Sequence, residues 1–156
     1  MVKIVLVFAS MSGNTEMMAD AIAEGVREVG EDLEVIDVIN GLEASVLEDY
    51  DGILLGAYTW GDGELPDDFL DFYDEMENVD LTGKKAAVFG SCDSAYPQYG
   101  AAVDILMEKL KERGAEVHPH GLKVELTPEK EEEACRTFGK NFVTSLQTRI
   151  DQKRED

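Results

Sequence analysis

The sequence has little cysteine and no cysteine motif, which argues against a small protein held together by disulfides and against one built around a cysteine-bound metal ion. Only 2 of its 156 residues are cysteines, Cys92 and Cys135, and they lie far apart without the spacing of metal ligands. A disulfide framework is therefore excluded, and a reducing compartment, the cytoplasm, is expected. His118 and His120 flank Pro119 without a further ligand beside them, so we expect them to be structural or exposed at the end of the strand, and we predict no metal site.

Basic residues are also scarce. The chain has 14 lysines and arginines against 34 aspartates and glutamates, which gives a formal net charge of -20. Such a surface repels nucleic acid and anionic membranes. It favours partners whose docking faces are basic, in associations that weaken with salt. The composition alone leaves a second interpretation open, in which the negative charge serves solubility only.

Long apolar segments are missing as well. No segment approaches the roughly 18 apolar residues that a membrane-spanning helix needs, so no membrane partner is expected. The apolar N-terminal run, residues 2–8, meets Ser10 without a small-residue cleavage pattern, and we expect a strand there and not a signal peptide. Hydrophobic residues nevertheless make up 44% of the chain, enough for a single domain over residues 1–150, followed by a polar C-terminal tail at 151–156.

Strands and helices alternate along this domain. Apolar runs predict buried strands, and amphipathic stripes such as Met18, Ile22, Val26 and Val29 predict helices. Strict alternation predicts an α/β fold, a three-layer α/β/α sandwich around a five-stranded parallel sheet. In such folds ligands lie beyond the carboxyl ends of the strands. We expect strands at 2–8, 33–38, 51–57, 85–90 and 115–126, where Pro119 allows a break, and helices at 14–29, 66–76, 101–113 and from 127 onward.

A loop rich in hydroxyl side chains links the first strand to the first helix. Its single glycine lets the backbone approach a ligand, and the helix that follows presents unpaired N–H groups and the positive end of its dipole. The pattern predicts a phosphate cradle built from neutral donors, because no lysine or arginine lies in it. A cluster that only caps the helix, with Ser12 or Asn14 as the cap, is the alternative. The loop consists of Ser10, Met11, Ser12, Gly13, Asn14 and Thr15.

Two further loops follow the third and fourth strands and meet the first loop at the same edge of the predicted sheet. The first of them holds Trp60, the only tryptophan, whose indole either stacks on a flat ligand or folds back as a lid. The other holds Tyr96, which is suited to the opposite face of such a ligand. Cys92 is expected to be a packing residue, because a phosphatase-type loop needs an arginine where Gln98 stands. The candidate site residues of the two loops are Tyr58, Thr59, Trp60, Gly61, Asp62, Ser91, Cys92, Asp93, Tyr96 and Tyr99.

The segments 10–15, 59–62 and 93–96, in this order and spacing, resemble the three binding loops of the flavodoxin family, and the resemblance extends over essentially the whole chain. The chain is similar to short-chain members, because the region of its fifth strand has no extra loop. Flavodoxin is itself the standard example of the strand order 2-1-3-4-5 with FMN at the switch point, so that order is implied by the resemblance. Met11 departs from the threonine common in the family, but backbone contacts do not need that side chain.

The resemblance implies FMN as cofactor, with its phosphate in the first loop and its ring between the other two. Trp60 and Tyr96 would flank the isoalloxazine ring. The carbonyl of Gly61 would turn toward flavin N5 when that atom becomes protonated, and Asp93 would face the pyrimidine edge. The implied phosphate ligands are Ser10, Ser12, Asn14 and Thr15.

The implied function is a low-potential one-electron carrier, not an enzyme, whose FMN passes between quinone, semiquinone and hydroquinone states. The expected partners are an NADPH-dependent flavodoxin/ferredoxin reductase as donor and low-potential enzymes as acceptors, which a monomer meets through its acidic surface. A flavodoxin-like FMN oxidoreductase that acts directly on a quinone or porphyrinogen is the alternative, but the short chain offers little material for a substrate pocket. A phosphorelay receiver domain shares the fold, but Ala9-Ser10 and Ala57-Tyr58 stand where it needs acidic residues.

Overall fold

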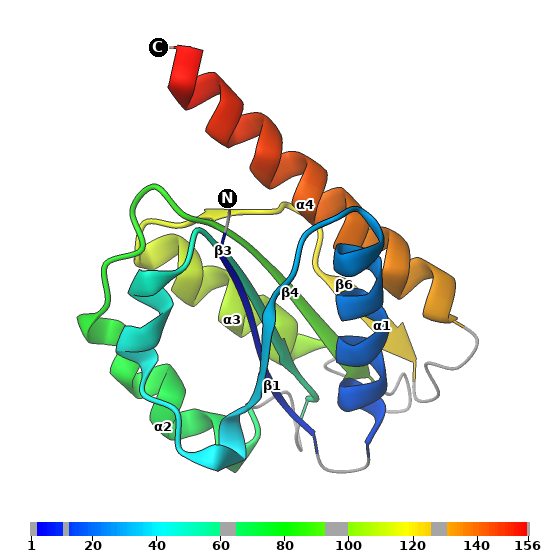
Figure 1. Ribbon diagram of the computed structural model, residues 1–156. Coiled ribbons are helices and arrows are strands. Elements are labelled where there is room, and N and C mark those ends of the chain that lie inside the picture. Colours follow the sequence, from blue (N-terminus) through cyan, green and yellow to red (C-terminus); the bar gives the residue numbers. More distant parts are fainter. Residues whose placement is uncertain (1–2, 11–12, 60–64, 93–99, 126–130, 156) are drawn as a thin grey trace.

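The computed structural model describes residues 3–10, 13–59, 65–92, 100–125 and 131–155. Within them a parallel sheet lies between two layers of helices (Figure 1). The strands are paired in the order β2-β1-β3-β4-β5, and β6 also pairs with β4. The strands are β1 (Ile4–Ala9), β2 (Glu34–Asp37), β3 (Gly52–Ala57), β4 (Lys85–Cys92), β5 (Glu116–Val117) and β6 (Leu122–Glu125).

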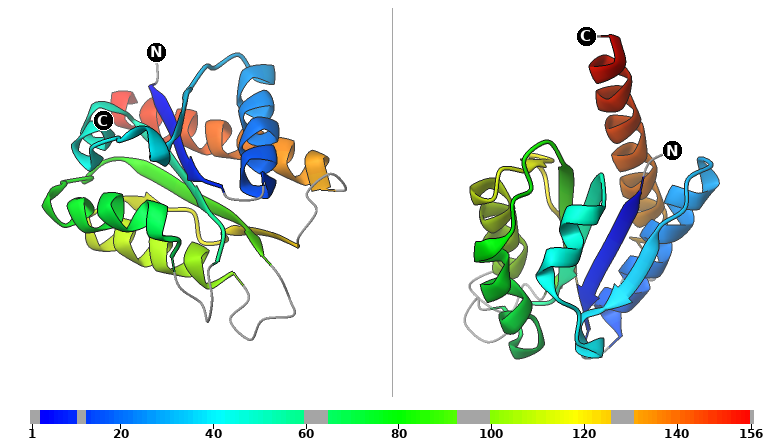
Figure 2. Two further views of the ribbon diagram at one scale, coloured as in Figure 1. Left: turned by 90° about the horizontal axis from the view of Figure 1, so that it is seen from below. Right: turned by 60° about the vertical axis from the view of Figure 1, so that its left-hand side comes forward.

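Helices cover both faces of the sheet. Helices α1 and α4 pack on one face, and α2 and α3 pack on the other, as the right-hand view of Figure 2 shows. The α-helices are α1 (Asn14–Glu28), α2 (Asp67–Glu75), α3 (Ala101–Glu112) and α4 (Glu132–Glu155). Short 3₁₀ helices, η1 (Val38–Asn40), η2 (Ala44–Asp49) and η3 (Met76–Asn78), join these elements.

The central strand β1 shows why the sheet is buried on both sides. All six of its residues are buried. Because side chains alternate along a strand, Val5 and Val7 belong to the core under α2 and α3, whereas Ile4 and Leu6 belong to the core under α1 and α4. A strand that is apolar at every position is what a parallel sheet between two helix layers requires.

The predicted strand order is confirmed, and the fifth position of the sheet is filled by two short strands. Strand β5 pairs with the start of β4 and β6 with its end, and the break between them contains Pro119. A proline has no N–H for the strand ladder, which accounts for the interruption. Strand β2 is the outermost strand on the other side of the sheet.

Two helix ends differ from the sequence prediction. Val29 is 41% exposed, because α1 already ends at Glu28 and Gly30, with φ 89°, turns the chain. Helix α4 extends to Glu155, through most of the stretch assigned to a polar tail, whose Gln, Lys, Arg and Glu residues are good helix formers. The predicted start of this helix at Thr127 lies outside the described residues.

Candidate functional site

Three strands end side by side at one edge of the sheet. Phe8 of β1 is in register with Gly56 of β3, and Gly56 is in register with Phe89 of β4. Since the strands are parallel, the chain leaves all three at the same edge, the lower edge in Figure 1. The three predicted loops therefore begin next to one another, as a ligand site built from all three requires.

The chain enters α1 from this edge through a left-handed turn at Gly13. Gly13 is the N-cap residue, with φ 90°, and a Cβ built on it would meet nothing within 4 Å. Ser10 supplies the cap that the glycine lacks, because its Oγ accepts the N–H of Gly13 at 3.1 Å and that of Glu16 at 3.4 Å. Asn14 is the first residue of the helix. The alternative prediction of Asn14 as N-cap is therefore wrong, because the left-handed glycine places the cap one residue earlier.

The hydroxyl of Thr15 in α1 forms a hydrogen bond with a side chain of β4. Its Oγ1 lies 2.8 Å from the Oγ of Ser91, and both side chains are buried. This contact joins the first predicted loop to the strand that precedes the third. The two residues are both sequence-predicted site residues, and the structure brings them together.

Thr59 links the second predicted loop to the helix that follows the third loop. It follows β3, and its Oγ1 accepts the N–H of Ala102 in the first turn of α3 at 3.2 Å. The N-cap residue of α3 is Gly100, which has no side chain to cap the helix. Thr59 therefore caps α3 from a neighbouring segment and fixes where the segment before Trp60 lies relative to the end of the third loop.

Gly90 also shapes the site, although it is not among the residues predicted from the sequence. A Cβ at this position would lie 2.2 Å from the carbonyl oxygen of Ala57, so only glycine lets β3 and β4 lie this close at the site edge. It directly precedes Ser91, whose position depends on this contact. A glycine just before a polar loop is a usable signal, but its purpose depends on a neighbouring strand that the local sequence does not reveal.

Tyr58 lies half-buried next to the acidic start of α2. Burial raises the pKa of its phenol above the ordinary value of 10.0, and the negative charges of Asp68 and Asp67 raise it further. Both aspartates are exposed. The potential at this edge of the molecule is thus negative, and it disfavours additional negative charge.

Several predicted site residues lie outside the part of the chain that the structure describes. The side chain of Cys92 is among them, although its backbone ends β4. The others are Met11, Ser12, Trp60, Gly61, Asp62, Asp93, Tyr96 and Tyr99.

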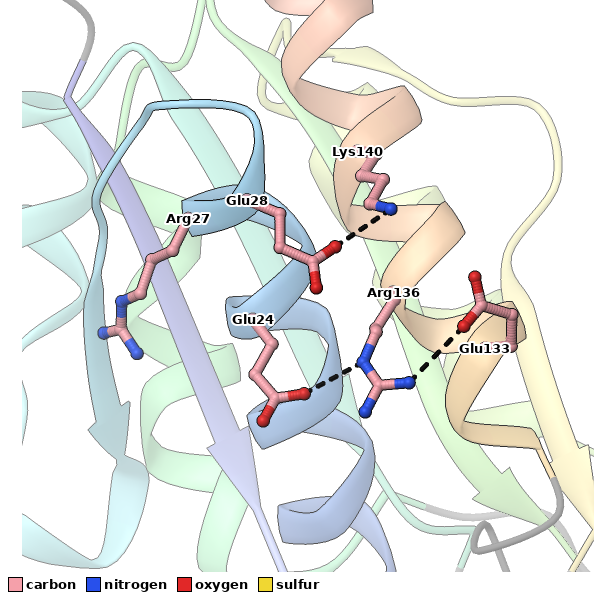
Figure 3. A pocket seen from close by; sticks show the side chains of 6 residues that line it. All are labelled: Glu24, Arg27, Glu28, Glu133, Arg136 and Lys140. Atoms are coloured by element: carbon pink, nitrogen blue, oxygen red, sulfur yellow. Dashed lines mark hydrogen bonds and ion pairs between the residues drawn. The ribbon is translucent and has the colours of Figure 1, made fainter.

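A surface groove between α1 and α4 is lined by charged side chains that form ion pairs. Figure 3 shows Arg136 with Glu24 and Glu133, and Lys140 with Glu28. Arg27, which also lines the groove, pairs with Asp32. Each cation of the groove therefore already has a carboxylate partner, and two of the ion pairs, Arg136 with Glu24 and Lys140 with Glu28, join α4 to α1. No helix in the described residues is long and apolar enough to cross a membrane.

Flavodoxins are among the known proteins that this chain resembles in sequence and in structure. The family model described as Flavodoxin matches residues 6–139. Probable flavodoxin 2 of Bacillus subtilis (strain 168) is 47% identical over 144 residues, which are 92% of this chain and 95% of that protein. The flavodoxin of Maridesulfovibrio salexigens is 42% identical over 134 residues, 85% of this chain and 92% of that protein. The crystal structure of oxidised Flavodoxin 1 from Bacillus cereus has a TM-score of 0.88 and 68% identity, and the match covers 91% of this chain and 97% of that one.

Proposed function

The chain belongs to the flavodoxin family of FMN-binding electron carriers, and on that premise we propose how its residues hold FMN and meet redox partners. When bound, FMN supplies the redox chemistry by taking up and releasing single electrons. The residues of the chain bind its two ends and exclude water from the ring. The observation that supports this most strongly is a pair of hydroxyl contacts: Thr15 with Ser91 joins the start of α1 to β4, and Thr59 with Ala102 joins the segment after β3 to α3.

The described residues around Gly13 fit a phosphate group. The space beside Gly13 is open, and the start of α1 directs its dipole and N–H groups toward an anion. Ser10 and Thr15 add hydroxyl donors. We propose that Ser10, Ser12, Asn14 and Thr15 bind the phosphate without help from a cation, since residues 9–15 contain neither lysine nor arginine.

The flavin ring belongs, in this proposal, between the segments after β3 and β4. Trp60 and Tyr96 flank its two faces, the Gly61 carbonyl faces N5, and Asp93 and its neighbours face the pyrimidine edge. Thr59 supports this arrangement because it ties the start of the Trp60 segment to α3. Exposed carboxylates of Asp67 and Asp68 stand beside Tyr58 at the same edge. Their charge makes the addition of electrons to a nearby flavin harder.

We propose that partners dock on this acidic edge. Exposed carboxylates flank it on both helix layers, from Glu16 and Asp20 of α1 to Asp67, Asp68 and Asp71 of α2. A basic face on the partner complements this pattern, and the association weakens as salt rises. The proposed donor is an NADPH-dependent flavodoxin/ferredoxin reductase, the proposed acceptors are low-potential enzymes, and the proposed carrier is a monomer. The cytoplasmic location stays a prediction.

An anaerobic reductive titration of the FMN-loaded protein tests the carrier function. The carrier is expected to take up electrons in two separate one-electron steps, seen as successive changes in flavin absorbance, and to show no oxidation of NAD(P)H by itself. Direct turnover of a quinone with NAD(P)H would instead support the oxidoreductase, which the flavodoxin relatives do not favour. Absence of FMN binding would overturn the proposal.

A further inference from the structure

Two buried hydroxyl groups from distant parts of the chain are paired beside the start of α1. Thr15 and Ser91 are 76 residues apart in sequence, and their oxygens are 2.8 Å apart. Thr15 is 1% exposed and Ser91 is 7% exposed. In the described part of the chain the only other buried polar side chain is that of Lys109. Two of the three buried polar side chains in the described residues thus meet at this one contact.

The two hydroxyl groups together carry one more proton than their mutual hydrogen bond uses. Each hydroxyl carries one proton and can accept as well as donate. The contact between Thr15 and Ser91 uses one proton, and neither hydroxyl has a second hydrogen-bond partner among the described residues. A buried donor without an acceptor is destabilising. The second proton therefore calls for an acceptor that the described residues do not supply.

The geometry points to a positioning role for Ser91, which rests on the function proposed above. We propose that the Ser91 hydroxyl donates to Thr15 Oγ1 and thereby leaves the Thr15 proton to a phosphate oxygen of FMN. Thr15 lies in the first turn of α1, among the N–H groups that favour an anion. Ser91 lies on β4, outside this helix end. A hydroxyl that accepts one hydrogen bond donates another more strongly, so Ser91 acts on the phosphate through Thr15.

Dissociation constants for FMN and riboflavin, measured by calorimetry, test this role, because only FMN carries the phosphate. Ser91→Ala is expected to weaken FMN about 3- to 10-fold, as for one lost hydrogen bond, and riboflavin less than about 2-fold. In a Thr15→Ala background the same substitution is expected to change FMN affinity by less than about 2-fold, because the hydroxyl through which Ser91 acts on the phosphate is already absent. Thr144→Ala on α4 removes an exposed hydroxyl remote from the site and is expected to change neither affinity.

The outcomes separate the two proposals. A wild-type protein that binds FMN no more tightly than riboflavin would overturn the proposed phosphate site itself. A phosphate preference that Ser91→Ala leaves intact, or an effect of Ser91→Ala that adds in full to that of Thr15→Ala, overturns only the positioning role. If urea unfolding shows that Ser91→Ala does not fold, Ser91→Cys replaces it, since a thiol keeps the size but donates weakly, and the same outcomes apply.

Discussion

Gly25 of α1 lies against the backbone carbonyl of Arg136 in α4, so close that a Cβ at residue 25 would be 2.1 Å from that oxygen. Gly139 of α4 makes the reciprocal approach, with a Cβ that would lie 2.3 Å from the carbonyl oxygen of Ile22. The two helices therefore cross backbone to backbone. Because α1 also begins at the proposed phosphate site, the depth of this crossing fixes the position of that site over the sheet.

Gly25→Ala is expected to destabilise the protein by roughly 1–3 kcal/mol, as overpacking of a close contact does. Helix propensity alone predicts the opposite sign, a gain of about 1 kcal/mol from replacing glycine in a helix. Urea unfolding of the cofactor-free protein measures the difference. Asn141→Ala, at an exposed position of α4, is the control, and a stabilised Gly25→Ala protein would show that the helices are free to separate.

Thr59→Val is expected to lower the free energy of unfolding by about 1 kcal/mol, because it removes the hydroxyl that caps α3. The Thr59 Oγ1 accepts the N–H of Ala102 at 3.2 Å, and Gly100 offers no side chain in its place. Thr59→Ser keeps this acceptor and is expected to retain most of the stability. Equal unfolding midpoints for the valine and serine variants would contradict the capping role.

The ion pair between Glu77 and Lys109 predicts a pH dependence of stability. The hydrogen bond from Lys109, and then its charge, hold the pKa of Glu77 below the ordinary 4.5, and the Lys109 ammonium lies over the ring of Tyr73. A carboxyl whose pKa is lowered by folding stabilises the protein above its unfolded pKa and loses this effect as the pH falls through its folded pKa. Glu77→Gln is therefore expected to be less stable than wild type at pH 7, with a difference that disappears at a pH well below 4.5.

Urea unfolding at the two pH values measures this difference. Glu75→Gln is the matched control, since Glu75 is exposed and forms no ion pair among the described residues. A difference between Glu77→Gln and wild type that stays constant down to acid pH would mean that the effect is not electrostatic.

The sheet and the general place of the site follow from local sequence patterns. The unbroken apolar run of β1 predicts burial on both faces, and the hydroxyl-rich segment after it predicts an anion site at the start of α1. The contact of Thr15 with Ser91 could not be predicted in this way, because it joins residues 76 positions apart. It depends on where β4 lies relative to α1, which a local pattern does not specify.

The helix cap illustrates a second limit. Asparagine is a preferred N-cap, so Asn14 is a natural candidate, yet Gly13 occupies the cap position and Ser10 supplies an oxygen. The N-cap glycine is left-handed and has no side chain, and the oxygen that accepts its N–H comes from Ser10, three residues earlier. N-cap preferences are given for the residue at the cap position, and they do not describe an acceptor that comes from another residue.

Replacing the two aspartates beside Tyr58 is expected to lower the pKa of its phenol. Burial is the largest cause of the raised pKa, and repulsion from Asp68 and then Asp67 adds to it. In the double variant Asp67→Asn, Asp68→Asn the pKa is therefore expected to fall but to stay above 10.0, because the phenolate remains poorly solvated. Added salt is expected to shrink the difference from wild type, since both carboxylates are exposed and screened.

Absorbance titration, with Tyr58→Phe as the reference that identifies the Tyr58 signal, measures these pKa values. Asp74→Asn, at another exposed position of α2, is the control and is expected to change the Tyr58 pKa little. If the double variant titrates like wild type at low salt, water screens the two carboxylates fully. They then have no influence on charge at this edge, and the proposed effect of these aspartates on a nearby flavin fails with it.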